Sequence, residues 1–316
     1  MAPHSDHDGA IVAAHTLSVE SMLRKIAVDG HVYTVAPTKS LGADRVPIEV
    51  CRRGLRDVSV FNGFCERHDR QLFSCLENQP FQFTRKQCFM LAYRAAAREC
   101  YLKGKHFESI PTPEQYTAVH GTGPSPVFEE VTRLLQAGSL SGLKDAAELK
   151  DALDVHLIAE AWDRLVTHAI LFTATPTVLA TAAFQPFFDM NGAQLQDFEN
   201  LEGDMSNLCF SLIPLDAGGA AVFSWLDSSN AAPRRFYESV LAQADITTAV
   251  IHAALDNTEN LALNPNWYES LSAEDRQYLF SRILHFEAGP DYAARRARGL
   301  TLRTLGHWGS ASSASF

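Results

Sequence analysis

The spacing of apolar residues changes along the chain, and each change predicts a different kind of element. Near the start the apolar runs are short: His31–Val35 alternates like a strand, and a second short strand is predicted around Val58–Phe61. Apolar residues at helical spacing then predict a long helix over Gln87–Lys103, starting near Thr84, and two more over Val127–Ala137 and Leu143–Thr167. In the first of these helices Arg94, Arg98 and Glu99 are interpreted as part of a solvated face.

After Thr167 the pattern becomes that of strands. His168–Phe188 is rich in Thr, Val, Phe and Ala and is broken by prolines, which predicts one or two strands. Leu208–Leu215 and Ala220–Leu226 predict two more, joined across Ala217-Gly218-Gly219, and Asp189–Gly192 is a turn sequence. These elements predict an α+β fold whose sheet is an antiparallel meander.

Composition places the chain among ordinary globular proteins and adds one asymmetry. The 316 residues contain no run of eighteen apolar residues, so no membrane span is expected. The first residues carry acids and histidines instead of a signal pattern, and six cysteines are too few for a disulfide scaffold, so we expect a cytoplasmic protein. Residues 1–106 have 15 Lys/Arg against 11 Asp/Glu, whereas the remainder has 12 against 26. Only the N-terminal third is therefore suited to a polyanion, and the alternative of two differently charged surfaces with no nucleic acid involved stays open.

The segment Phe61–Glu77 carries the most specific chemistry. Cys65 and His68 are spaced as two ligands of one cation at the start of a predicted helix. His4 and His7 repeat that spacing near the N-terminus, and the four side chains would make a His3Cys zinc site. Two plainer interpretations stay open: a mobile, His-rich terminus, and a buried Cys65 thiol.

Several motifs together resemble an uncharacterised bacterial family. Its members open with Cys-x-x-Cys-Gly before a His-Ser-Ile-like motif and continue with Gly-Phe-Cys-x-x-His-Asp. The matching segments of this chain are His15–Ser18, Leu23–Ile26, Gly30–Tyr33, Phe61–Phe73, Gln87–Arg98, Phe188–Gly192 and Val222–Leu226. Where relatives have the paired cysteines this chain has His4 and His7, which the resemblance identifies as a replacement of zinc ligands.

The N-terminal pattern is similar, more loosely, to HNH endonucleases of the treble-clef type. That resemblance implies His15 as the general base and Asp69 as a ligand of a second divalent ion such as Mg2+. It also implies phosphate contacts from nearby arginines: Arg52, Arg53, Arg56, Arg67 and Arg70. The chain departs from the pattern at Ala14, where these nucleases carry an acid. Plainer roles are helix-dipole compensation for Asp69 and packing for His15.

We therefore expect a treble-clef-like zinc module over residues 1–80 and a helical connection over 81–167. An α+β body with an antiparallel sheet over 168–308 and a frayed tail over 309–316 would follow. Three functions stay open. The first is a metal-dependent nuclease, and the second is a zinc-stabilised binding protein whose acidic body recognises a protein partner. The third is an enzyme whose site lies in the C-terminal body.

Overall fold

The centre of the molecule is an eight-stranded antiparallel sheet. The computed structural model describes residues 2–3, 9–37, 48–197, 205–284 and 302–316. The strand order is β10-β5-β8-β7-β6-β9-β2-β3. The bounds of these strands are β2 His31–Pro37, β3 Ile48–Gly54, β5 Leu165–Phe172, β6 Val178–Phe184, β7 Leu208–Pro214, β8 Gly219–Leu226, β9 Leu261–Leu263 and β10 Ala311–Ser315. The predicted α+β class with an antiparallel sheet is confirmed.

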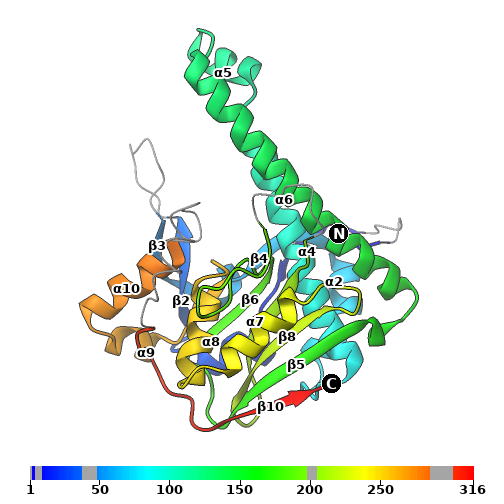
Figure 1. The fold of residues 1–316 in the computed structure, drawn as a ribbon, viewed down its shortest axis with the longest axis vertical. Coiled ribbons are helices and arrows are strands. Elements are labelled where there is room, and N and C mark those ends of the chain that lie inside the picture. Colours follow the sequence, from blue (N-terminus) through cyan, green and yellow to red (C-terminus); the bar gives the residue numbers. More distant parts are fainter. Residues whose placement is uncertain (1, 4–8, 38–47, 198–204, 285–301) are drawn as a thin grey trace.

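Both faces of this sheet are covered, and side chains alternate between two cores. In β8, Ala220 and Val222 belong to one core, whereas Ala221, Phe223 and Trp225 belong to the other. Helix α4 (Arg85–Ser109) packs on the first face, and α7 (Ala232–Leu241) and α8 (Ile246–Leu255) cover the second (Figure 1). Two further helices, α9 (Pro265–Ser270) and α10 (Ala273–Leu284), follow β9.

A smaller strand–strand–helix unit lies on the α4 side; we call it the ββα unit. It consists of β1 (Ile11–His15), β4 (Val60–Cys65) and α2 (Glu66–Leu72), followed by the short α3 (Ser74–Glu77). Between its two strands the chain forms the helical turns η1 (Val19–Leu23), α1 (Arg24–Ile26) and η2 (Leu55–Asp57), together with β2 and β3.

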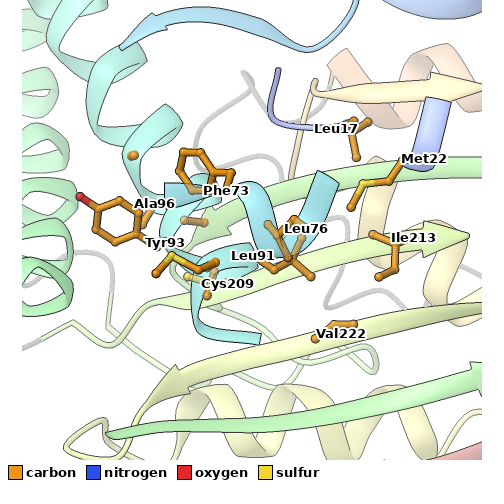
Figure 2. Close-up of a cluster of buried hydrophobic side chains, with 14 of the residues drawn as sticks. Leu17, Met22, Phe73, Leu76, Leu91, Tyr93, Ala96, Cys209, Ile213 and Val222 are labelled. Carbon is orange, nitrogen blue, oxygen red and sulfur yellow. The ribbon is translucent and has the colours of Figure 1, made fainter. Parts of the chain in front are cut away.

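One continuous core joins the ββα unit to the large sheet. Phe73 and Leu76 from its helical part belong to one buried cluster with Leu91 of α4 and Ile213 of β7, and Leu76 lies beside Leu91 (Figure 2). The strands β2 and β3, which come from the predicted module over 1–80, pair within the large sheet. The large sheet therefore contains strands from both sides of residue 80.

A helical hairpin projects from the body, and we call it the arm. It contains the C-terminal part of α4, all of α5 (Pro113–His120) and the N-terminal part of α6 (Pro126–Ile158) (Figure 1). Among the described residues, no helix is long and apolar enough to cross a membrane.

Three expectations need correction. The two helices expected over 127–137 and 143–167 are the single helix α6, which ends at Ile158. The segment before Val58 contains a strand, β3, which was not expected because arginines and prolines interrupt the apolar pattern of this segment. The tail expected to be frayed includes β10, which pairs with β5 from Ala311 opposite Phe172 to Ser315 opposite His168. Backbone pairing with β5 orders this tail, together with the stacking of the Phe316 ring on that of Phe83.

Candidate functional site

The ββα unit places His15 and Asp69 on neighbouring elements. Strand β1 pairs antiparallel with β4, with Ile11 opposite Cys65 and His15 opposite Val60. The register shifts between Val12 and Ala14, the kind of bulge that redirects side chains near functional sites. His15 is thus the last residue of the first strand, and Asp69 lies on the helix that directly follows the second.

The imidazole of His15 is half-buried and is oriented by the backbone. Its Nε2 lies 3.3 Å from the carbonyl oxygen of Leu55. A carbonyl oxygen can only accept, so this contact requires the proton on Nε2. In the neutral ring Nδ1 then carries the lone pair, which is the form that can act as a base.

Next to His15 lies a cluster of two carboxylates around one buried guanidinium. Arg94 of α4 is fully buried, and its Nη2 donates to Glu77 Oε1 at 2.6 Å. The same Nη2 lies 3.6 Å from Asp69 Oδ1. The ring of Phe73 lies beneath the guanidinium, 4.0 Å from its carbon to the ring centroid. Arg94 therefore fixes the positions of both carboxylates from the core side.

The charges of this cluster act on His15. Burial is the main cause that lowers the pKa of His15, and the positive charge of Arg94 lowers it further. The hydrogen bond to the Leu55 carbonyl and the negative charges of Asp69 and Glu77 raise this pKa. Burial raises the pKa of Asp69, whereas Arg94 and His15 lower that pKa and Glu77 raises it. His15 and Asp69 therefore influence each other's pKa in opposite directions, as expected for an imidazole and a carboxylate in one unit.

Asp69 also offers an acceptor for a cation. Its Oδ1 is buried and accepts no hydrogen bond from any described residue, since the 3.6 Å separation from Arg94 is too long for one. A cavity of about 350 Å³ borders the cluster at Glu77. Its lining includes the apolar residues Met22, Leu76 and Ile213 but not Asp69 itself. A buried carboxylate oxygen without a donor fits a divalent cation or an ordered water.

The expected zinc pair is brought together in the same unit. Cys65 Sγ and His68 Nδ1 are 3.2 Å apart, and both residues are buried. Two ligands of a tetrahedral zinc, one sulfur and one nitrogen, stand about 3.5 Å apart, so the observed separation suits a shared cation as well as a hydrogen bond. Within the described ranges no group of three metal-binding side chains occurs. His4 and His7 lie outside the described residues. Three residues after His7, the carbonyl oxygen of Ala10 accepts a hydrogen bond from Glu66 N at the start of α2.

The five arginines expected to contact phosphate do not share one element. Arg52 and Arg53 lie on β3, the edge strand of the large sheet, and Arg56 lies in η2. Arg67 and Arg70 lie on α2, which is well separated from β3 in Figure 1. Only the last two therefore belong to the ββα unit.

Arg94 and Glu77 are site residues that sequence reasoning missed. Arg94 had been interpreted as part of a solvated face, but its side chain is 0% exposed. A signal was present, because Arg94 is the only charged residue in the run Cys88–Ala97. An isolated charge within such a run predicts a buried ion pair.

Comparisons with known protein families, with curated proteins and with solved structures found no match for this chain. The function is therefore argued from the geometry of the ββα unit.

Proposed function

We propose that the ββα unit is an HNH-like site for metal-dependent hydrolysis of phosphodiester bonds. The observation that carries the proposal is the placement of His15 at the end of β1 and of Asp69 on α2, in a unit whose two strands pair directly and whose Asp69 lies beside the buried Arg94. One residue ends the first strand and the other lies on the following helix, which are the positions that the HNH resemblance assigns to the base and to a metal ligand. A treble-clef-like zinc site on Cys65, His68, His4 and His7 would hold the unit together and belongs to the same proposal.

His15 takes the role of general base. Its lowered pKa keeps the ring neutral near pH 7, and its bond to Leu55 O leaves Nδ1 to accept a proton. Nδ1 removes a proton from water, the water oxygen forms a bond to phosphorus, and the bond from phosphorus to the leaving oxygen breaks. A divalent cation held in part by Asp69 would stabilise the negative charge that gathers on the phosphate oxygens.

Arg94 is a positioning residue in this scheme. Its guanidinium keeps Glu77 and Asp69 in place, and its positive charge helps to keep His15 unprotonated. Arg67 and Arg70 on α2 are the arginines best placed for the phosphate backbone of a substrate, because they lie on the same helix as Asp69.

A cleavage assay tests the proposal. Purified protein is incubated with plasmid DNA, single-stranded DNA and RNA in the presence of Mg2+, Mn2+ or Ni2+. We expect cleavage that falls at least about 100-fold in His15→Ala, the usual contribution of a general base. The matched control is His31→Ala, because His31 is exposed and its Nδ1 is bonded to the Asp29 carbonyl in the same turn.

Two outcomes would contradict the proposal. One is no cleavage of any of these nucleic acids with any of the three metals, which would favour a non-catalytic binding protein. The other is equal cleavage by His15→Ala and the parent, which would move the catalytic site to another part of the chain. A candidate for such a site is the cavity of about 370 Å³ lined by Asp145, Glu148, Ser206, Asn207 and Asn230.

A further inference from the structure

The arm is ordered by its own contacts, away from the sheet (Figure 1). Helix α5 begins with a reciprocal cap between Thr112 and Gln115, and Ser125 caps α6 by accepting from Phe128 N. At the tip the ring of Tyr116 lies 4.4 Å from that of Phe128, centroid to centroid. The arm is therefore a preformed hairpin that presents a defined surface.

That surface is unusually apolar. Most of the exposed large apolar side chains of the described residues lie on the arm, with Val119 at 78% exposure, Val127 at 74% and Leu134 at 57%. Val131 and Leu135 are also about half exposed, and α5 has no buried residue. Apolar side chains gathered in one place, and not scattered singly, mark an interaction surface.

On α6 these side chains form one line. Val127, Val131 and Leu134 are separated by four and three residues, and Leu135 lies beside Leu134. We call these four residues the α6 stripe. Gly138 and Ser141 continue the same spacing with small side chains, and a Cβ added to Gly138 would meet no atom within 4 Å. Alternating steps of four and three are the spacing at which one helix packs along another.

We propose that the α6 stripe is the contact between two copies of this chain, joined arm to arm with α6 antiparallel to α6. When the twofold axis passes between Leu134 and Leu135, Val131 of one copy lies opposite Gly138 of the other. The part of the line with large side chains in one copy then faces the part with small side chains in the other. Leu134 packs against Leu135 of the second copy. A line of this kind is complementary to itself, as a twofold contact requires. No charged residue occupies its positions from Val127 to Ser141.

The size of the arm agrees with a reversible dimer. Pro126 to Gly142 of α6 spans about 25 Å, and a single helix with its side chains is about 10 Å wide. One face of α6 therefore offers about 250 Å² per copy, or about 500 Å² in total, which is the size of a weak and transient contact. We infer that the dimer forms and dissociates with concentration.

Sedimentation velocity over a range of protein concentrations tests this inference. The mass is expected to rise from 34.8 kDa towards twice that value in the parent and to stay at 34.8 kDa in Leu134→Glu. Val155→Glu is the matched control, because Val155 is 63% exposed on the same helix but outside the line. It should dimerise like the parent. Circular dichroism of each variant checks that α6 is intact.

A cross-link tests the position of the axis. Leu134→Cys should give a disulfide-linked dimer under mild oxidation, whereas Val155→Cys and the parent, with its own free cysteines, should not. A parent that stays at the monomer mass at every concentration would overturn the proposal. So would a Leu134→Glu variant that dimerises as the parent does, because the contact would then lie elsewhere. Either result would be independent of the cleavage assay.

Discussion

At the scale of single residues, Arg94 connects the core to the candidate site. It is fully buried, yet its charge is shared with two carboxylates that are still partly exposed, Asp69 at 22% and Glu77 at 32%. A buried cation is tolerated when acceptors surround it, and its loss leaves those acceptors near the core without a donor. Arg94 therefore affects stability and the electrostatics of His15 together.

Replacing Arg94 by Met should lower the free energy of unfolding by about 2–3 kcal/mol. Loss of one partner of a buried pair costs more than this, but partial exposure of Asp69 and Glu77 reduces the effect. Arg133→Met is the control, because its ion pair with Glu130 is exposed to solvent and should contribute little to stability. Urea unfolding measures both changes. If both variants lowered the free energy of unfolding equally, the Arg94 cluster would stabilise the protein no more than an exposed ion pair does.

The titration of His15 is predicted to be shifted to low pH. Burial and Arg94 lower its pKa, so the neutral base should persist below pH 6.5, and cleavage should rise with pH only through that lower range before it levels off. Asp69 raises the pKa of His15, so Asp69→Asn should move its midpoint lower still. Proton NMR, with His15→Ala identifying the signal, measures both midpoints without relying on activity. A midpoint above 6.5 in the parent would contradict the environment described here.

At the scale of elements, strands with strong patterns could be predicted, and elements held by tertiary contacts could not. The meander of β7 and β8 matched its two apolar runs and the glycines between them. α6 was divided in two because Gly138, Ser139, Ser141 and Gly142 are weak helix formers, yet its packing against α4 keeps the helix continuous. β10 had no apolar signal at all, since it is defined by its pairing with β5.

The candidate site divides in the same way. His15, Asp69, Cys65 and His68 could be chosen from the sequence because motif spacing and the resemblance place them on one small unit. The isolated charge of Arg94 in an apolar run indicates a buried ion pair, but it does not indicate that Glu77 is the partner, because these two residues meet through the packing of α3 against α4. Spacing along the chain contains no information about which distant elements meet in this way.

The turn between β7 and β8 provides a prediction for this scale. Gly218 has φ +80°, and an added Cβ would stand 1.9 Å from the carbonyl oxygen of Phe172. Gly218→Ala should therefore destabilise the protein by about 3 kcal/mol through strain and displacement of the neighbouring backbone. Gly123→Ala is the control, because a Cβ there would meet nothing within 4 Å, and it should change stability by less than about 0.5 kcal/mol. Thermal unfolding compares them; similar melting temperatures would contradict the steric account.

At the scale of the whole molecule, the ββα unit is built into the body. Its helical residues Phe73 and Leu76 share one core with α4 and with β7 of the sheet (Figure 2). The large sheet thus provides a rigid base for the candidate site, while the arm projects from the other end of α4 (Figure 1). The proposed catalytic and dimerisation surfaces are consequently separate, and each can be altered without the other.

The proposed zinc module and HNH-like nuclease both require that the purified protein contains zinc. The Cys65–His68 pair can hold a zinc ion only with two further ligands, and the sequence offers His4 and His7 for these positions. Elemental analysis of purified protein, beside His4→Ala/His7→Ala, measures this directly. We expect one zinc per chain in the parent and its loss in the variant. A parent protein without bound metal would contradict the zinc module and, with it, the HNH-like nuclease.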